Sequence, residues 1–323
     1  MQRGLSEMID AMKRGDTRAL ARTITLVENR GPGWKEAMQA IYSDTGSACV
    51  FGITGSPGAG KSTLTNEIAL RLHDQGYSLG IIAVDPSSPF SGGALLGDRL
   101  RMRNICMKTD IFIRSMATRG VLGGLCQAAK DVVRILDAAG KDIILIETVG
   151  AGQDEIDVVR VSDFVMVVCI PGQGDGIQAI KAGIMEIADL FIVNKADLGG
   201  ADEIVADITG MLDLCTHDGI PRPSIMKTSA ETKEGLDDLV ANLIAFARQR
   251  KAATEVNRNH VKEEILSLLE REVFHLVREE LSGNGRFEEA VEQVLNHRRD
   301  PYSTVEELLC QFPLYRGVKT REK

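Results

Sequence analysis

The residues with the clearest chemical purpose form one glycine-rich stretch. It fits the pattern G-x-x-x-x-G-K-[ST], in which backbone N–H groups surround phosphate oxygens. An apolar run, 48–54, precedes it, and a helical pattern follows at Leu64, Ile68 and Leu72. A glycine-rich turn that binds nothing is the alternative, and the flanking strand and helix patterns argue against it. The candidate phosphate-binding residues are Gly55, Ser56, Pro57, Gly58, Ala59, Gly60, Lys61, Ser62 and Thr63.

Lys61 and Ser62 provide the side-chain chemistry of this motif. We expect the Lys61 ammonium to reach the β- and γ-phosphates and the Ser62 hydroxyl to hold Mg²⁺. The helix predicted to begin near Lys61 adds the positive end of its dipole. The stretch therefore predicts a site for a magnesium-bound nucleotide.

A second motif, Asn194-Lys195-Ala196-Asp197, follows the apolar run 190–193. The Asp197 carboxylate can accept hydrogen bonds from both N1–H and the N2 amine of guanine. Adenine lacks this donor pair and would leave a buried carboxylate unpaired. We expect Asn194 to support the base loop and the Lys195 stem to lie along the base plane. The nucleotide is therefore predicted to be GTP or GDP, and a backbone N–H for guanine O6 is expected from the turn containing Ser229, Ala230 and Glu231.

Three carboxylates could organise the metal and the attacking water. Glu147 follows four apolar residues, 143–146, which is the Walker B arrangement with glutamate in place of the usual aspartate. Asp85 and Asp98 bracket a glycine- and serine-rich segment that is either filler or a loop ordered by ligand. A helix cap alone would explain Asp98, and a solvated strand end would explain Glu147. Beside the P-loop, we predict catalytic roles for Lys61, Asp85, Asp98 and Glu147, and metal binding, directly or through water, by Ser62, Asp85, Asp98 and Glu147.

The segment 171–181 places glycines and polar side chains at a predicted strand-to-helix junction. Asp175 could cap the helix. Gln178 and Lys181 follow three and six residues later, broadly on one helix face. An ordinary surface helix has the same pattern, so these residues alone leave the two interpretations open.

The elements that must position these residues alternate along the middle of the chain. Amphipathic helical stretches such as 122–139 and 236–247 separate most of the apolar runs. This pattern predicts an α/β fold with a mainly parallel sheet flanked by helices, and ligands beyond the carboxyl ends of the strands. The predicted strands are 50–54, 80–84, 111–114, 143–146, 164–170, 190–193 and 225–228.

Composition excludes several classes of protein. The net charge of −8 argues against a general nucleic-acid or anionic-membrane surface. The six cysteines include no C-x-x-C pair, and the five histidines show no metal-ligand spacing. No apolar run approaches the ~20 residues of a membrane span, and Met1 to Gly4 begin no apolar leader. We therefore expect a cytoplasmic protein with reduced cysteines and without a membrane partner.

Both ends of the chain are predicted to be helical. A short basic run over 248–251 leads to a long amphipathic helix over 256–281, followed by shorter ones over 287–295 and 304–309. Its apolar stripe needs a partner, either the nucleotide-binding domain or a second chain, and we favour a second chain. The predicted division is a helical extension over 1–45, a G domain over 46–250 and a helical dimerisation region over 251–323.

Together these segments resemble the MeaB/ArgK family, SIMIBI-class P-loop GTPases that act as chaperones of adenosylcobalamin-dependent acyl-CoA mutases. The resemblance also includes the segment 97–102, and its segments 85–88 and 147–153 are far more specific than the P-loop. The resemblance implies switch I carboxylates at Asp85 and Asp98, and a switch II over 148–155 that includes Gln153. It also implies a third switch, which signals nucleotide state to the mutase, at Asp175, Gln178 and Lys181. Asp154 departs from the small polar residue expected there and affects only the detailed switch II contacts.

The resemblance implies a homodimeric GTPase that gates cofactor delivery to a mutase, by default methylmalonyl-CoA mutase, and that protects and reactivates this partner. The chain has no evident arginine finger in cis, so slow hydrolysis that a mutase stimulates is expected. A metallochaperone is one alternative, but the chain has neither a His-rich tract nor a Cys pair. A transport-system kinase, the ArgK-type alternative, would be expected to use ATP, which the motif Asn194–Asp197 disfavours.

Overall fold

The computed structural model describes residues 2–85, 110–117, 124–148, 161–171, 188–215, 222–252, 258–283 and 285–312. The chain divides into two compact units, Met1–Ala253 and Thr254–Lys323. The first unit begins with helices α1 (Gln2–Lys13), α2 (Thr17–Glu28) and α3 (Trp34–Ile41) and a 3₁₀ turn (Tyr42–Asp44). Sheet strands and covering helices follow.

Seven strands of the first unit form one sheet within the described residues. They are β1 (Cys49–Gly55), β2 (Leu79–Asp85), β3 (Ile111–Ala117), β4 (Ile143–Thr148), β5 (Phe164–Cys169), β6 (Leu190–Val193) and β7 (Ser224–Lys227). Their order is β3-β2-β4-β1-β5-β6-β7, and every pair of neighbours is parallel. The predicted parallel α/β fold is confirmed, because each predicted apolar run forms one of these strands.

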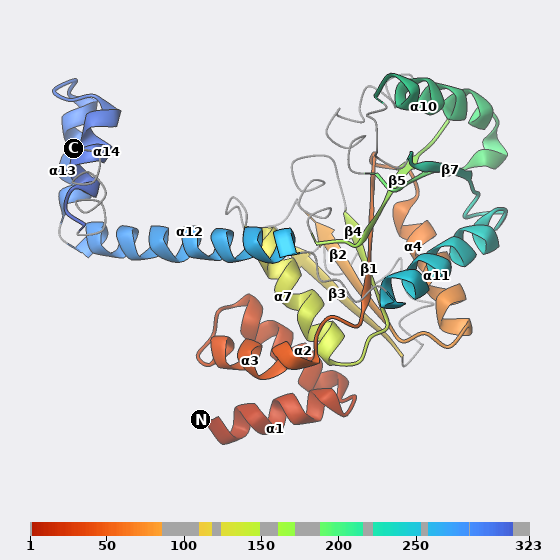
Figure 1. The fold of residues 1–323 in the computed structure, drawn as a ribbon, viewed down its shortest axis with the longest axis horizontal. Coiled ribbons are helices and arrows are strands. Elements are labelled where there is room, and N and C mark those ends of the chain that lie inside the picture. Colours follow the sequence, from red (N-terminus) through yellow and green to blue (C-terminus); the bar gives the residue numbers. More distant parts are fainter. Residues whose placement is uncertain are drawn as a thin grey trace. The chain divides into compact units, whose positions relative to one another are not determined.

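Helices cover both faces of this sheet (Figure 1). They are α4 (Lys61–Asp74), α7 (Gly124–Ala138), α10 (Ala201–Cys215) and α11 (Leu236–Ala252), and a 3₁₀ turn lies at Ala196–Leu198. Phe51 and Leu145 pack with α4 and α11, whereas Val50 and Ile144 pack with α7 and the N-terminal helices. Successive strand side chains point to opposite faces, so this alternation determines on which face each strand-end side chain lies.

The N-terminal helices share the core of the first unit. Met12 and Ile24 are fully buried in the same cluster as Leu136 of α7. An ion pair of 2.9 Å joins Arg30 Nη1 to Asp131 Oδ2 of α7, and the same guanidinium lies 4.0 Å from the ring centre of Trp34. The N-terminal segment is therefore fixed to α7 by both apolar packing and a charged contact.

The second unit contains α12 (Arg258–Gly283), α13 (Arg286–Leu295) and α14 (Pro301–Leu309). Along α12, Val261, Ile265, Leu269 and Leu276 recur at helical spacing, and all are exposed. The predicted apolar stripe is thus present on α12, and these four described side chains of the second unit are exposed. Among the described helices, none combines the length and apolar character that crossing a membrane requires.

Two buried thiols give the first testable prediction. Burial raises the pKa of Cys49 and of Cys169 to about 12. The reactive thiolate is therefore nearly absent at pH 8 and increases only as the pH approaches 12. We expect both cysteines to resist iodoacetamide in the folded protein at pH 8 and to react after unfolding in guanidinium, as measured by mass spectrometry. Rapid alkylation of either thiol in the folded protein would contradict the buried environment.

Candidate functional site

The candidate site lies at the carboxyl ends of β1, β4 and β6, where the strands lead into loops. The P-loop connects β1 to α4, and two of its glycines are required by close neighbours. Gly55 has a φ of 136°, and a Cβ there would lie 2.1 Å from the Val168 carbonyl oxygen of β5. Gly60 has a φ of 84°, and a Cβ there would lie 2.6 Å from Asn194 Nδ2. The loop therefore needs glycine at both positions for packing as well as for backbone conformation.

Helix α4 begins at Lys61, as predicted from the motif. Its N-cap is Gly60, which offers no side-chain hydrogen bond to the first turn. The first N–H groups of a helix have no partner within the helix, so this end can bind anionic oxygens. The loop and the helix start thus provide the donors that a phosphate chain requires.

The Lys61 side chain lies inside the P-loop. Its Nζ donates to the Gly55 carbonyl at 2.6 Å and to the Ser56 carbonyl at 3.1 Å, and the residue is only 6 % exposed. These carbonyls hold the ammonium beside the backbone amides of the same loop. Its charge is therefore concentrated where phosphate oxygens would enter.

Ser62 and Glu147 meet across the ends of α4 and β4. Ser62 Oγ donates to Glu147 Oε1 at 2.5 Å, and Glu147 is 1 % exposed. A hydroxyl and a carboxylate are hard oxygen donors of the type that Mg²⁺ prefers. In the described residues, no group of three His, Cys, Asp or Glu side chains could hold a metal ion. The donor chemistry fits a magnesium ion whose coordination is completed by phosphate and water.

The base motif is attached to the P-loop through one side chain. Asn194 Nδ2 donates to the Ala59 carbonyl at 2.8 Å, while its Oδ1 accepts from Thr228 Oγ1 at 3.3 Å and from the Ala230 N–H at 3.2 Å. Asn194 is buried, and Lys195 has a φ of 58°. One amide therefore joins the phosphate loop, the base loop and the turn after β7.

The turn after β7 is organised by its own hydrogen bonds. The Ser229 N–H donates to the Glu234 carbonyl at 3.0 Å, and Ser229 Oγ accepts from the Thr232 N–H at 3.0 Å. The Ala230 N–H is the group that donates to Asn194. Ser229 and Ala230 therefore shape the turn that was predicted to face the base, and Glu231 lies on its exposed side.

The structure describes only part of the predicted metal and switch residues. The backbone of Asp85 ends β2, next to β4, because Val84 pairs with Thr148 in the sheet. Its side chain lies outside the described residues, as do Asp98, Gln153, Asp175, Gln178 and Lys181. The structure thus brings together Lys61, Ser62 and Glu147 and leaves the remaining assignments as predictions.

The motifs did not reveal one contact near the site. Thr148 Oγ1 donates to Thr54 Oγ1 at 3.2 Å, and both residues are buried. The sequence signal was a threonine near the end of each of two mainly apolar strands. Polar residues in that position are common, so the strand register was needed to show that they meet.

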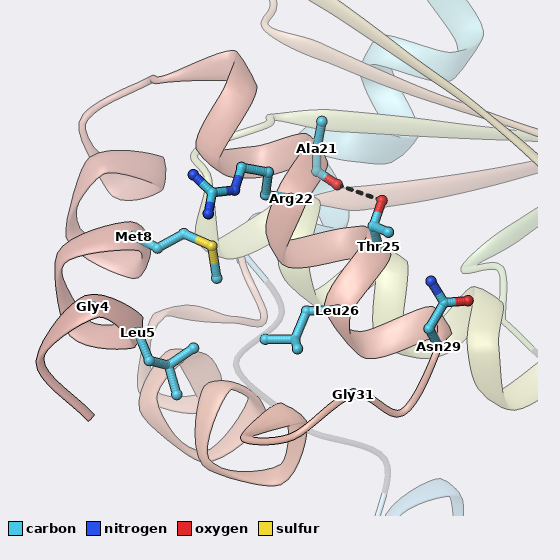
Figure 2. A pocket seen from close by; sticks show the side chains of 9 residues that line it. All are labelled: Gly4, Leu5, Met8, Ala21, Arg22, Thr25, Leu26, Asn29 and Gly31. Atoms are coloured by element: carbon cyan, nitrogen blue, oxygen red, sulfur yellow. Dashed lines mark hydrogen bonds between the residues drawn. The ribbon is translucent and has the colours of Figure 1, made fainter. Parts of the chain in front are cut away.

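An open hollow of about 640 Å³ lies among the N-terminal helices (Figure 2). Leu5, Met8 and Leu26 contribute apolar lining, and Arg22 lies at its side. None of the predicted site residues lines it. The hollow is therefore separate from the nucleotide loops.

A P-loop on a parallel sheet, an acidic strand end beside its serine and an N-K-x-D loop bonded to it define a P-loop protein of the guanine-nucleotide-binding class. The chain belongs to the family described as methylmalonyl-CoA mutase-associated GTPase MeaB, whose model matches residues 20–284. This confirms the family resemblance found in the sequence.

Individual proteins agree with this assignment. A Pyrococcus abyssi protein named as a GTPase is 43 % identical over 314 residues, which span 95 % of this chain and 97 % of the relative. The GTPase ArgK of Escherichia coli is 36 % identical over 287 residues, spanning 82 % and 86 %. A solved structure described as an LAO/AO transport system kinase has a TM-score of 0.69 at 26 % identity and covers 95 % of this chain and 97 % of its own.

Proposed function

We propose that this protein is a magnesium-dependent GTPase that acts as a chaperone of an adenosylcobalamin-dependent acyl-CoA mutase. The observation that carries the proposal is the family match over residues 20–284, because the family is described by its association with methylmalonyl-CoA mutase. The proposal includes cofactor gating, and protection and reactivation of the mutase. Cytoplasmic location and the absence of nucleic-acid and membrane partners remain part of the proposal.

The chemistry assigned to this chain is mainly positioning and charge neutralisation. Lys61 and the P-loop amides would stabilise negative charge on the β- and γ-phosphates as the bond to the γ-phosphoryl group breaks. Ser62 and Glu147 would hold magnesium, with Asp85 and Asp98 contributing directly or through water. A magnesium ion held there would supply positive charge that offsets the charge of the phosphates. Asp197 would select guanine, and Asn194 keeps its loop against the P-loop.

The partner is tested by measuring GTP hydrolysis with and without methylmalonyl-CoA mutase. Slow hydrolysis by the protein alone and a rise of about tenfold or more with the mutase are expected, because a partner that orders switch loops completes the catalytic arrangement. A bovine serum albumin control excludes nonspecific stabilisation. A hydrolysis rate that does not change when the mutase is added would contradict the proposed partner. The absence of any hydrolysis would contradict the proposed GTPase activity.

The preference for guanine or adenine nucleotides distinguishes the proposed GTPase from the kinase alternative. The solved structural relative is described as a transport system kinase, which makes ATP use worth testing. A guanine-specific site binds GDP far more tightly than ADP, because adenine cannot satisfy the Asp197 carboxylate. Comparable affinities for GDP and ADP would contradict the GTPase proposal and favour the kinase.

We further propose that the protein is a homodimer formed through the second unit. Ile265 and Leu269 of α12 are 60 % and 58 % exposed, and both lie on the apolar stripe of this helix. Apolar stripes of this extent are normally covered by a partner. A second copy would bring an identical stripe, as in two-fold symmetric interfaces.

The proposed dimer can be tested by its oligomeric state in solution. The double change Ile265→Glu and Leu269→Glu is expected to convert dimers to monomers in sedimentation velocity experiments, with GDP affinity unchanged, because two charges would have to be desolvated in the interface. Ser267→Glu is the matched control, since Ser267 lies about half a turn away on the same helix and is exposed. Monomers from the unmodified protein would contradict the proposed dimer.

A further inference from the structure

Thr54 of β1 and Thr148 of β4 lie next to each other on the face of the sheet opposite Glu147. The register of β1 and β4 places Ile53 beside Glu147, so Thr54 and Thr148 are the next residues along the two parallel strands. Thr148 Oγ1 donates to Thr54 Oγ1 at 3.2 Å and approaches the Ile53 carbonyl at 3.4 Å. Thr54 is 0 % exposed and Thr148 2 % exposed. This hydroxyl pair is therefore a buried bond between strand ends.

Apolar packing alone does not account for a hydroxyl at either position. The neighbouring side chains on this face, Val50, Ile144 and Ile146, belong to an apolar cluster. Valine has nearly the shape of threonine and would avoid the desolvation of a hydroxyl, which is costly unless a hydrogen bond compensates it. The two hydroxyls compensate each other, and the bond they form is directional in a way that valine contacts are not.

The place of this bond in the chain connects it to the site. Thr54 directly precedes Gly55, the first residue of the P-loop, and Thr148 directly follows Glu147. Because strand side chains alternate, Glu147 points to the α4 face, where it accepts the hydrogen bond from Ser62. The threonine bond thus joins the end of β4 to the end of β1, the strand that leads into the P-loop, on the face of the sheet opposite the Ser62–Glu147 contact.

We propose that Thr148 is a positioning residue whose hydroxyl bond to Thr54 fixes the end of β4 against the P-loop strand and thereby keeps the Glu147 carboxylate within reach of Ser62. The inference rests on the proposed GTPase function and specifies how its metal-binding pair is held. Loss of the bond would let the Glu147 backbone shift by a fraction of an ångström. A misplacement of that kind reduces catalysis more than it reduces nucleotide binding.

The test compares Thr148→Val, which removes the hydroxyl at nearly constant shape, with Thr148→Ser, which retains it. Thr23→Val is the matched control, because Thr23 is also fully buried and its hydroxyl donates to the Ala19 carbonyl at 2.9 Å in α2. The measurements are kcat and KM for GTP, the Kd for fluorescent GDP with magnesium and with EDTA, and thermal unfolding.

For Thr148→Val we expect kcat to fall about tenfold or more, KM to stay within about threefold, and the gain in GDP affinity on adding magnesium to shrink about tenfold. Thr148→Ser is expected to stay within about threefold of the unmodified protein in kcat, and Thr23→Val to lower the melting temperature with kcat unchanged. Affinity for GDP in EDTA should not change in any of them.

Two results would overturn the inference. One is a Thr148→Val protein that matches Thr23→Val in kcat and in the magnesium effect. The other is a Thr148→Ser protein as impaired as Thr148→Val, since the hydroxyl would then be irrelevant. If Thr148→Val does not fold, Thr54→Val removes the acceptor of the same bond and is judged by the same criteria. An unmodified protein without GTP hydrolysis would refute the proposed function, while the magnesium effect on GDP affinity would still decide the role of Thr148.

Discussion

Replacing Lys61 with alanine is expected to lower the rate of GTP hydrolysis about 10³-fold, the loss typical of removing one preorganised charge-stabilising donor. The ammonium is held inside the P-loop by the Gly55 and Ser56 carbonyls, so its removal takes a positive charge out of the proposed phosphate site. Single-turnover hydrolysis of radiolabelled GTP measures the effect. GDP affinity is expected to fall as well, because the β-phosphate loses a charged partner.

Lys262→Ala is the control for this experiment, since Lys262 is an exposed lysine of α12 in the second unit. The same substitution there should leave hydrolysis within twofold. A Lys61→Ala protein that folds, as judged by circular dichroism, and retains more than a tenth of the unmodified rate would show that the P-loop is not the catalytic phosphate site.

The second large effect is expected from Asp197→Asn. The carboxylate is predicted to accept both guanine donors, and an amide presents one donor in place of an acceptor. We expect GDP affinity to fall about 10³-fold and the affinity for xanthosine diphosphate to rise to a comparable level, because xanthine carries a carbonyl where guanine carries its amine. Competition against fluorescent GDP measures both changes.

Asp207→Asn provides the matched control, because Asp207 is an exposed aspartate of α10. The Asp207→Asn protein should have the same preference for guanine as the unmodified protein. If Asp197→Asn binds GDP as tightly as the unmodified protein, the base is recognised elsewhere and the predicted role of the 194–197 motif is wrong.

The sequence was sufficient for the strands because their signal is local and strong. The run 143–146 is apolar at every position, which is typical of a strand buried on both faces, and it forms most of β4. Lys61 and Ser62 were likewise predictable, because a P-loop requires that order of residues on a strand–loop–helix unit. In both cases a short stretch of chain contains the whole physical requirement.

Contacts between distant segments could not be predicted in the same way. Asn194 was expected to support the base loop, but its bond to Ala59 joins residues 135 positions apart. The close approach of Asn194 to Gly60, which leaves no room for a Cβ at position 60, has the same origin, as does the contact of Thr54 with Thr148. Each depends on which strands are neighbours and in what register, and that information is spread over the whole sheet.

The bond from Asn194 to the P-loop has a consequence for the energetics of binding. A ligand that orders the phosphate loop also orders the base loop, so the conformational entropy lost on binding is shared between the two ends of the nucleotide. Guanosine or inorganic pyrophosphate, when bound separately, would each have to order both loops at the full cost in conformational entropy. Their separate binding free energies should therefore sum to less than the binding free energy of GDP.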